Sequence, residues 1–360
     1  MNHMRRALRL ARRALGSVHP NPAVGSLVVN EGVVKGEGRT QPPGGNHAEI
    51  VALKAAGSFA EGGVLYTTLE PCVHFGKTPP CTDYIIESGI KEVRISTTDP
   101  NPMVFGKGIQ KLRDADVKVV VGEENEQGMK IIEAYTKFIT SKMPFVTAKF
   151  AMSLDGKVAT SSGDSKWISN ERSRWYTHTI RSQSDAILTG INTVIADDPL
   201  LTARNERGNP RAKQPVRVVI DTNARIPETS RLLKEPGESI LACSRIDPLK
   251  MEYLKQLGVK TIISESPQGN VDIYKTIQTL GLEQNITSIF VESGPTVMGS
   301  LFDLNLVDKV IAFIAPTIIG GSNSPSPVAG VGVDEMLESL KLQRVQWKRF
   351  GRDMAIIGYC

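Results

Sequence analysis

The sequence lacks any run of eighteen or more apolar residues, so no segment of it is predicted to span a membrane. It also lacks the G-x-G-x-x-G pattern, the usual dinucleotide-binding fingerprint. Only four cysteines are present, Cys72, Cys81, Cys243 and Cys360, and their spacing is not that of a disulfide framework. The expected location is therefore a reducing cytoplasm.

The segment Met4–Leu15 has several arginines and no acid, a composition that also occurs in transit peptides. Its apolar residues recur at helical spacing with arginine on the other face, which favours the first helix of a folded domain. The apolar stretch of a secretory signal is missing.

The charge balance shows little excess of either sign. A net charge of +5 suits a phosphorylated substrate or an anionic cofactor, but it is too weak to indicate nucleic acid. A stripe of aromatic and basic residues on which bases could stack is also missing. The expected partner is a small phosphorylated molecule, and neither nucleic acid nor a membrane is expected.

A chain of 360 residues exceeds what one hydrophobic core usually serves, so two domains are expected. Strand and helix patterns alternate in both halves, which predicts an α/β domain in each. The best candidate boundary is Ser141-Lys142-Met143-Pro144, which gives domains 1–143 and 144–360.

Strands Ala23–Val29 and Val33–Gly38 flank a turn and predict a hairpin. A longer helix is expected at Glu124–Ile139. Further strands are expected at Val64–Thr68, Val93–Thr97, Val117–Val121, Phe145–Phe150, Ala186–Thr189, Val216–Asp221, Ser239–Cys243, Thr261–Ile263, Ser288–Val291 and Lys309–Ile314, and helices at Ala48–Ala56, Thr82–Ser88, Ile109–Ala115, Glu171–Arg181, Pro248–Leu257, Val271–Leu280 and Val297–Leu304.

The most informative motif is His47-Ala48-Glu49, followed by Pro71-Cys72 and then by Cys81. One imidazole and two thiolates suit Zn²⁺, and three protein ligands leave the fourth position open, as in catalytic zinc sites. Water bound there ionises near neutral pH and becomes a nucleophile, and Glu49 can shuttle its protons. The order H-x-E…P-C…C is the zinc deaminase signature. Both pieces of the site stand where a helix is expected to begin, so helix dipoles would favour the thiolates.

The two cysteines are separated by eight residues, whereas nucleobase deaminases usually have C-x-x-C. The insert contains Lys77, which could reach a phosphate, and the hydrogen-bonding side chains His74 and Thr78. Gly76-Lys77-Thr78 mimics the end of a Walker A loop, but Pro71 stands where that motif needs glycine, so a P-loop is rejected. His74 is a weak competitor for the metal.

Seven segments, taken in order, carry a family resemblance: Asn21–Gly25, His47–Glu49, Thr68–Cys81, Ser153–Lys157, Asp164–Ile168, Asp197–Thr202 and Val291–Gly294. Together they resemble the bifunctional riboflavin-biosynthesis deaminase–reductases over nearly the whole chain. The resemblance implies a cytidine-deaminase-like three-layer α/β/α domain followed by a dihydrofolate-reductase-like α/β domain. It also implies one Zn²⁺, NADPH and a homo-oligomer, a dimer or a tetramer.

The implied substrate is 2,5-diamino-6-ribosylamino-4(3H)-pyrimidinone 5′-phosphate. The resemblance implies hydrolytic deamination at C2 of its ring, and then NADPH-dependent reduction at C1′ of the ring-opened ribose to give the ribitylamino uracil. In the deaminase half it implies His47, Cys72 and Cys81 as zinc ligands and Glu49 as the proton shuttle. Substrate contacts are expected from Asn21, His74 and Lys77.

In the reductase half the resemblance implies a cofactor site and a substrate site. Arg181 and Arg204 would grip the phosphate, since guanidinium groups bind it bidentately. Lys149 and Glu292 are both candidates to supply the proton for reduction, and the sequence does not rank them. Ser293 stands where many relatives have a second glycine. The expected cofactor residues are Ala151, Trp167, Thr193, Asp197, Thr222, Gly294, Pro295, Thr296, Val297, Met298, Gly299 and Ser300, and the expected substrate residues are Ser165, Arg181, Leu201, Arg204 and Glu292.

Two other classes of protein compete with this hypothesis. One is a deaminase of nucleic acids or free nucleosides whose second half only binds or scaffolds. The long insert between the cysteines and the mild charge argue against it. The other is a non-catalytic protein stabilised by zinc. A structural site would more often have four protein ligands, and Glu49 would then have no purpose.

Overall fold

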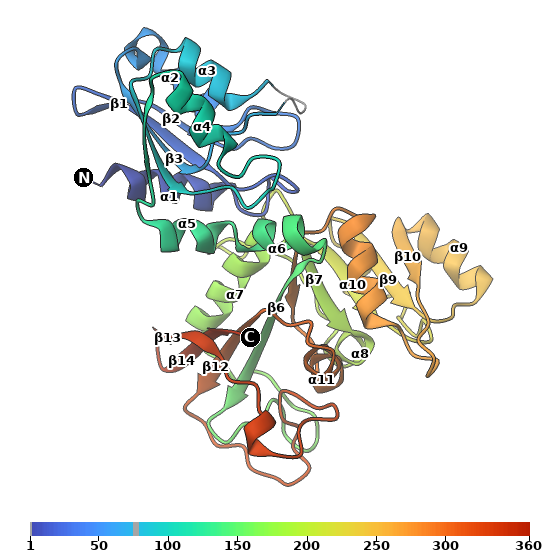
Figure 1. Cartoon of the computed structure of the whole chain (residues 1–360). Coiled ribbons are helices and arrows are strands. Elements are labelled where there is room, and N and C mark those ends of the chain that lie inside the picture. The colour runs from blue at the N-terminus through green and yellow to red at the C-terminus, as the bar shows by residue number, and fades with distance from the viewer. Residues whose placement is uncertain (1, 75–78) are drawn as a thin grey trace. The chain divides into compact units, whose positions relative to one another are not determined.

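The computed structural model describes residues 2–74 and 79–360. The chain forms two compact units, Met1–Met143 and Pro144–Cys360 (Figure 1). Within the described part of the chain, no helix has both the length and the apolar character that crossing a bilayer requires.

The first unit is built on a five-stranded mixed sheet in the order β2-β1-β3-β4-β5. The predicted hairpin is confirmed, because β1 pairs antiparallel with β2. β1 is also antiparallel to β3, whereas β3, β4 and β5 run parallel. Parallel neighbours need crossover connections, and helices supply them here. The strands are β1 (Gly25–Asn30), β2 (Val33–Arg39), β3 (Val64–Leu69), β4 (Glu92–Thr97) and β5 (Lys118–Val121).

Helices cover both faces of this sheet, which confirms the three-layer α/β/α prediction (Figure 1). One core cluster joins the sheet to α2, α3 and α4, and includes Leu53, Ile85 and Leu112. A second cluster joins the other face to α1 and α5, and includes Leu8 and Ile131. The helices are α1 (His3–Ala14), α2 (Ala48–Ala56), the 3-10 turn η1 (Gly57–Ala60), α3 (Cys81–Glu87), α4 (Lys107–Asp114), α5 (Asn125–Ile131) and α6 (Glu133–Ser141).

The prediction of one long helix over Glu124–Ile139 is wrong. The segment forms two helices, α5 and α6, which meet at Ile132, where the backbone leaves helical geometry (φ −99°, ψ 13°). Both Ile131 and Ile132 are buried in the core, at 7% and 4% exposure. Burial of both side chains outweighs the local preference for continuing the helix.

The second unit is built on a nine-stranded sheet in the order β10-β9-β8-β7-β11-β6-β12-β14-β13. The strands from β10 to β12 run parallel, and β14 is antiparallel to both of its neighbours. The hairpin of β13 and β14 was not among the predicted elements. The strands are β6 (Phe145–Ser153), β7 (Ala186–Gly190), β8 (Val216–Ile220), β9 (Ser239–Cys243), β10 (Val259–Ile263), β11 (Ser288–Val291), β12 (Lys309–Ala315), β13 (Gln343–Phe350) and β14 (Asp353–Tyr359).

Helices connect the parallel strands and bring the ends of distant segments together. The short helix α8 follows β7 and was not predicted, because asparagine, threonine, valine and isoleucine are weak helix formers. Since β6, β7 and β11 are neighbours and parallel, their carboxyl ends meet at one edge of the sheet. The helices are α7 (Glu171–Gln183), α8 (Ile191–Asp197), α9 (Pro248–Gln256), α10 (Ile273–Leu282) and α11 (Pro295–Asp303), with short 3-10 turns η2 (Arg231–Leu233) and η3 (Met336–Glu338).

Candidate active sites

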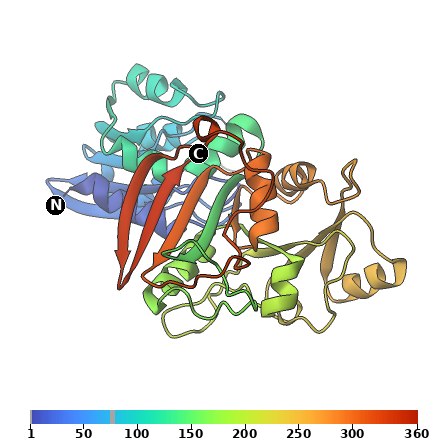
Figure 2. The ribbon, with the colours of Figure 1, turned by 90° about the horizontal axis from the view of Figure 1, so that it is seen from below.

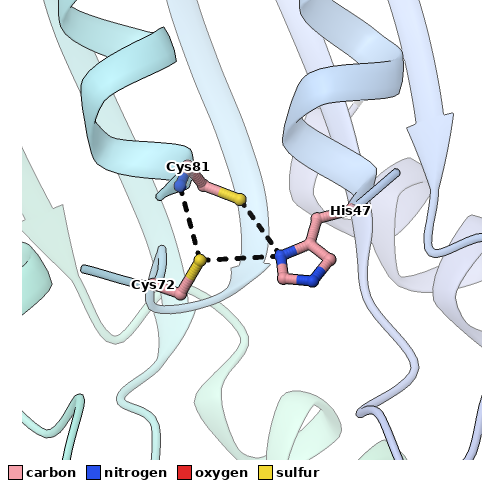
Figure 3. Close-up of side chains that lie close together, drawn as sticks. All are labelled: His47, Cys72 and Cys81. Atoms are coloured by element: carbon pink, nitrogen blue, oxygen red, sulfur yellow. Dashed lines mark hydrogen bonds between the residues drawn. The ribbon is translucent and has the colours of Figure 1, made fainter. Parts of the chain in front are cut away.

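The first unit brings His47, Cys72 and Cys81 together, as their spacing predicted (Figure 3). The Nδ1 atom of His47 lies 3.2 Å from Sγ of Cys81 and 3.6 Å from Sγ of Cys72. Their donor atoms all lie within 4.8 Å of one another. A tetrahedral zinc ion with ordinary Zn–S and Zn–N bonds needs donor atoms roughly 3.5–3.8 Å apart, so the three donors fit Zn²⁺.

The two helix starts that flank this cluster explain how it is held. His47 is the N-cap residue of α2, and Cys81 is the first residue of α3. Neither N-cap residue, His47 of α2 or Pro80 of α3, makes a side-chain hydrogen bond to its helix, and both helices begin at the cluster. The backbone N–H of Cys81 donates to Sγ of Cys72 at 3.4 Å. A hydrogen bond from the Cys81 thiol, together with His47 and the Cys81 N–H, lowers the pKa of Cys72 against the effect of burial. The contact with Cys72 and burial both raise the pKa of Cys81.

Glu49 lies beside the cluster on the first turn of α2. Its side chain is buried, and Oε2 lies 3.8 Å from Sγ of Cys81. Burial raises the pKa of the Glu49 carboxyl to about 7, against the opposing effect of His47. A carboxyl group beside an open metal position is placed to exchange protons with whatever occupies that position.

Glu70 is a positioning residue that sequence reasoning missed. Its buried carboxylate accepts hydrogen bonds from the backbone N–H groups of Asp99, Gly106, Gly108 and Ile109, at 3.0–3.3 Å. These bonds tie the turn before Cys72 to the start of α4. The signal in the sequence was an acid placed at the end of a buried strand and just before Pro-Cys, where only a strongly hydrogen-bonded carboxylate is tolerated.

The three substrate residues predicted for this unit differ in where the structure places them. Asn21 is half-buried in the loop that leads into β1. His74 is half-buried two residues after Cys72, and among residues 2–74 and 79–360 its buried Nδ1 atom has no hydrogen-bond partner. His74 is not part of the metal-ligand cluster. Lys77 and Thr78 lie outside the described residues.

The second unit contains a cavity of about 730 Å³ at the carboxyl ends of β6, β7 and β11. Most of the predicted reductase residues line it, although they come from five separate parts of the chain. The lining includes the predicted residues Lys149, Ala151, Ser165, Trp167, Arg181, Thr193, Asp197, Leu201, Arg204, Glu292, Gly294 and Pro295. Thr222 and the residues Thr296, Val297, Met298, Gly299 and Ser300 are not part of this lining.

A row of three charges crosses the cavity. Arg181 donates to Glu292 through Nε (2.5 Å) and Nη2 (3.1 Å), and Nζ of Lys149 lies 3.6 Å from Oε2 of Glu292. Burial lowers the pKa of Lys149, although the Glu292 carboxylate opposes this. Burial would raise the pKa of Glu292, but Arg181 and Lys149 outweigh it, so the net shift is downward.

The turn between β11 and α11 is locked to the turn between β7 and α8. The Gly294 N–H donates to Oγ1 of Thr193 at 3.0 Å, and the Gly190 N–H donates to Oγ of Ser293 at 2.9 Å. Ser293 therefore uses its hydroxyl to join the two turns. Gly294 caps α11 without a side-chain hydrogen bond, and because Pro295 has no N–H, the N–H groups of Thr296 and Val297 are the ones open to an anion. A dinucleotide pyrophosphate fits such a turn.

His178 and Arg174 are among the lining residues that sequence reasoning missed. Both lie on α7 at helical spacing before Arg181, three and seven positions away, which was a signal in the sequence. Arg174 lies over the ring of Trp167, 4.5 Å from its centroid. Burial, together with Arg181, lowers the pKa of His178 to about 4, so its imidazole adds no positive charge at neutral pH.

Comparison with known proteins gives matches over the whole chain. A model of the RibD C-terminal domain matches residues 144–356, and a model of the cytidine and deoxycytidylate deaminase zinc-binding region matches residues 1–97. The riboflavin biosynthesis protein RibD of Aquifex aeolicus is 41% identical over 355 residues, which covers 99% of this chain and 97% of that protein.

Two solved structures are similar throughout. Acinetobacter baumannii RibD is 33% identical with a TM-score of 0.88, over 99% of this chain and 97% of its own. The diaminohydroxyphosphoribosylaminopyrimidine deaminase/5-amino-6-(5-phosphoribosylamino)uracil reductase of Thermotoga maritima is 34% identical with a TM-score of 0.87, at the same coverage.

Proposed function

Since this chain belongs to the RibD family of bifunctional riboflavin-biosynthesis enzymes, we propose that its two units divide the deamination and reduction steps between them. Residues 1–143 would form the zinc-dependent pyrimidine deaminase domain, and residues 144–360 the NADPH-dependent reductase domain. The observation that carries this division is that each candidate site lies wholly inside one compact unit.

His47, Cys72 and Cys81 would hold Zn²⁺, which when bound supplies a Lewis acid that makes water nucleophilic near neutral pH. Glu49 would take the proton of that water, deliver it to a ring nitrogen of the pyrimidine, and then protonate the leaving amine. Its burial supports this role, because a carboxyl group shielded from bulk water exchanges its proton with the bound substrate.

Asn21, His74 and Lys77 would hold the pyrimidine ribosylamino phosphate in the deaminase site. The unpaired Nδ1 atom of His74 supports its part, because a buried ring nitrogen without a partner is costly until a ligand provides one. Lys77 would meet the phosphate, and its position in the insert between the two cysteines supports that role.

In the reductase site, NADPH supplies the hydride to C1′ of the opened ribose, and the protein must supply a proton. We assign that proton to Lys149. The two cations beside Glu292 lower its pKa and keep it a carboxylate, so it has no proton to give at neutral pH. The buried Lys149 ammonium is a stronger acid than an ordinary lysine. Glu292 would orient Lys149, and Arg181 would orient Glu292.

The substrate phosphate would be bound chiefly by Arg204. Nε of Arg204 is held by Oγ1 of Thr202 at 2.9 Å, which turns the guanidinium group without engaging its terminal amino groups. All three nitrogens of the Arg181 guanidinium group make hydrogen bonds, Nε and Nη2 to Glu292 and Nη1 to the carbonyl of Thr202. Ser165 and Leu201 line the same cavity and would complete the substrate site.

The cofactor would lie along the carboxyl edge of the sheet. Ala151 and Trp167 would flank the nicotinamide, and Thr193 with Gly294 would hold the pyrophosphate at the start of α11. Trp167 is 69% exposed, so a flat ring is available to cover a ligand. The other proposed cofactor residues are Asp197, Thr222, Pro295, Thr296, Val297, Met298, Gly299 and Ser300.

A homo-oligomer would form through an apolar face of the second sheet. Strands β6, β12, β14 and β13 carry one row of Phe150, Ala312, Ile356 and Trp347 across the sheet, and Trp347 is 63% exposed. No helix of the drawn ribbon lies in front of β12, β14 and β13 in Figure 2. Two such faces from two copies would pack about 10 Å apart, as sheets do in sandwiches.

The enzyme would act in the cytoplasm. Its four cysteines are all free thiols, which fits a reducing compartment.

One assay tests the whole proposal. The purified, zinc-replete enzyme is given the diaminopyrimidine ribosylamino phosphate with and without NADPH, and ammonia release and NADPH loss are followed. We expect ammonia release without NADPH, and NADPH loss only after deamination. Ammonia release without any NADPH loss would favour a deaminase with a binding module, and no turnover at stoichiometric zinc would favour a structural zinc protein.

A further inference from the structure

Two arginines stand at the sheet edge beyond the reductase cavity. Arg225 follows β8 and Arg245 follows β9, and these strands are adjacent and parallel. Both side chains are exposed. The two loops are joined, since the N–H groups of Ser244 and Arg245 both donate to the carbonyl of Thr222 at 3.2 Å. Both arginines therefore project from a single rigid corner of the sheet.

Each guanidinium group is oriented by an asparagine. Nη2 of Arg225 donates to Oδ1 of Asn192 at 2.9 Å, and Nε of Arg245 donates to Oδ1 of Asn223 at 2.7 Å. Asn192 lies on α8 next to Thr193, the residue that holds the Gly294 turn. Among the described residues the Nη groups of Arg245 have no hydrogen-bond partner, so they are available to a ligand.

The order of strands places this corner where the adenosine end of the cofactor must lie. Along the edge the order is β6, β11, β7, β8 and β9. In the proposed cofactor site the nicotinamide end would lie at β6 and the pyrophosphate at the turns after β11 and β7. With about 4.8 Å between strands, the ends of β8 and β9 lie roughly 5–10 Å beyond the pyrophosphate turn. The adenosine ribose reaches that far.

Asp221, the acid at this corner, is not placed to bind a free ribose hydroxyl. In dinucleotide folds an acid after the strand binds the 2′-hydroxyl of NAD, whereas an arginine there accommodates the 2′-phosphate of NADP. Asp221 directly follows β8 and is fully buried, and its Oδ2 accepts the N–H of Ile226 at 2.7 Å. Its Oδ1 faces Nε of Arg225 at 3.9 Å. The surface offered to the ribose is therefore cationic.

We propose that Arg225 and Arg245, with Thr222 between their loops, form the site that binds the 2′-phosphate of NADPH and selects it over NADH. The inference rests on the assignment of the cofactor to this sheet edge. Guanidinium groups suit it because they bind phosphate oxygens bidentately, as lysine cannot.

The test measures binding rather than turnover. Calorimetric titrations with NADP⁺, NAD⁺, 2′,5′-ADP and 5′-AMP are made on the wild type, on the single variants and on Arg225→Gln/Arg245→Gln. Arg352→Gln, an exposed position in the turn between β13 and β14, is the matched control. The double variant is expected to bind NADP⁺ and 2′,5′-ADP about 10–100-fold more weakly, with NAD⁺ and 5′-AMP unchanged.

Unchanged NADP⁺ affinity in the double variant, or an equal loss for NAD⁺, would overturn the inference. A second measurement needs no variant: 2′,5′-ADP should protect Arg225 and Arg245 of the wild type from phenylglyoxal, and 5′-AMP should not. Lack of protection would also overturn it. If NADP⁺ does not bind the wild type at all, the cofactor assignment itself fails, whereas equal binding of NADP⁺ and NAD⁺ removes only this selectivity site.

Discussion

Arg181 and Glu292 form a bidentate ion pair across the reductase cavity, with Nε–Oε1 at 2.5 Å and Nη2–Oε2 at 3.1 Å. The third contact of Arg181, from Nη1 to the carbonyl of Thr202 at 3.0 Å, engages the third nitrogen of the guanidinium group. The pair joins α7 to the end of β11. In the proposed mechanism Arg181 would position Glu292, and Arg204 would be the cation that meets the substrate phosphate.

Arg181→Gln and Arg204→Gln should therefore have different kinetic effects. Loss of Arg204 removes a charge-assisted contact to the phosphate, so KM of the reductase step should rise about 10–100-fold with little change in kcat. Loss of Arg181 leaves Glu292 poorly oriented, so kcat should fall at least about tenfold. Steady-state kinetics on the deaminated intermediate measure both. If Arg181→Gln raised KM and left kcat unchanged, the proposed role of Arg181 in positioning Glu292 would be contradicted.

Lys149→Met should lower kcat of the reductase step by about 10²–10⁴-fold while NADPH still binds. The donor must carry its proton, so activity is full below the pKa of Lys149 and is lost as pH rises through it. Because burial lowers that pKa, the alkaline limb should lie below the range of an ordinary lysine. In Glu292→Gln the limb should move to still lower pH, because the carboxylate that raises the pKa of Lys149 is gone. An alkaline limb that Glu292→Gln does not move would argue against Lys149.

Glu49→Gln should retain zinc and lose deamination by about 10²–10⁴-fold, because the amide keeps the shape of the side chain but cannot shuttle protons. Ammonia release and zinc content are measured on the same samples. Glu31→Gln, in the exposed turn between β1 and β2, is the matched control. Full activity of metal-replete Glu49→Gln would remove the proton-shuttle role.

Glu70→Gln should weaken zinc binding by about 10–100-fold, although Glu70 does not touch the metal-ligand atoms. The amide cannot accept all four backbone N–H groups that now hold the turn before Cys72. Competition with a chelator measures the affinity, and Glu87→Gln on exposed α3 surface serves as control. Equal zinc retention in the two variants would show that the Glu70 carboxylate does not position Cys72.

Trp347→Glu should dissociate the proposed oligomer, since a charge on the apolar sheet face would be buried in the interface. Sedimentation velocity measures the change in mass. Leu249→Glu alters a side chain that is 83% exposed on α9, and it should leave the assembly intact. A wild type that sediments as a monomer, or a Trp347→Glu variant that stays associated, would refute this interface.

Much of the deaminase site was accessible from the sequence because its chemistry is local. His47 and Glu49 are two residues apart at one helix start, and Cys72 and Cys81 flank a single insert, so ligand type and spacing were enough to predict a zinc site. The role of Glu70 was not predicted, since its four partners lie at least 29 positions away in the chain. Hydrogen bonds between residues so far apart in the chain depend on the order of the strands in the sheet.

The reductase site was accessible only through family resemblance. Its charged row joins Lys149, Arg181 and Glu292, which are brought together because β6, β7 and β11 are neighbours in the sheet. No local pattern indicates that Arg181 pairs with Glu292 rather than with a phosphate. The break between α5 and α6 has a similar cause, because burial of both Ile131 and Ile132 in the core decided it.

The sequence by itself determined the two α/β domains, the zinc ligand set and Glu49, because periodicity and ligand spacing act over a few residues. The tertiary structure alone decided which cations meet which carboxylates and which face of the second sheet stays apolar and exposed. It also decided that Arg225 and Arg245 share one corner of the second sheet. Those relations follow from the order of parallel strands, which brings residues more than a hundred positions apart to within hydrogen-bond distance.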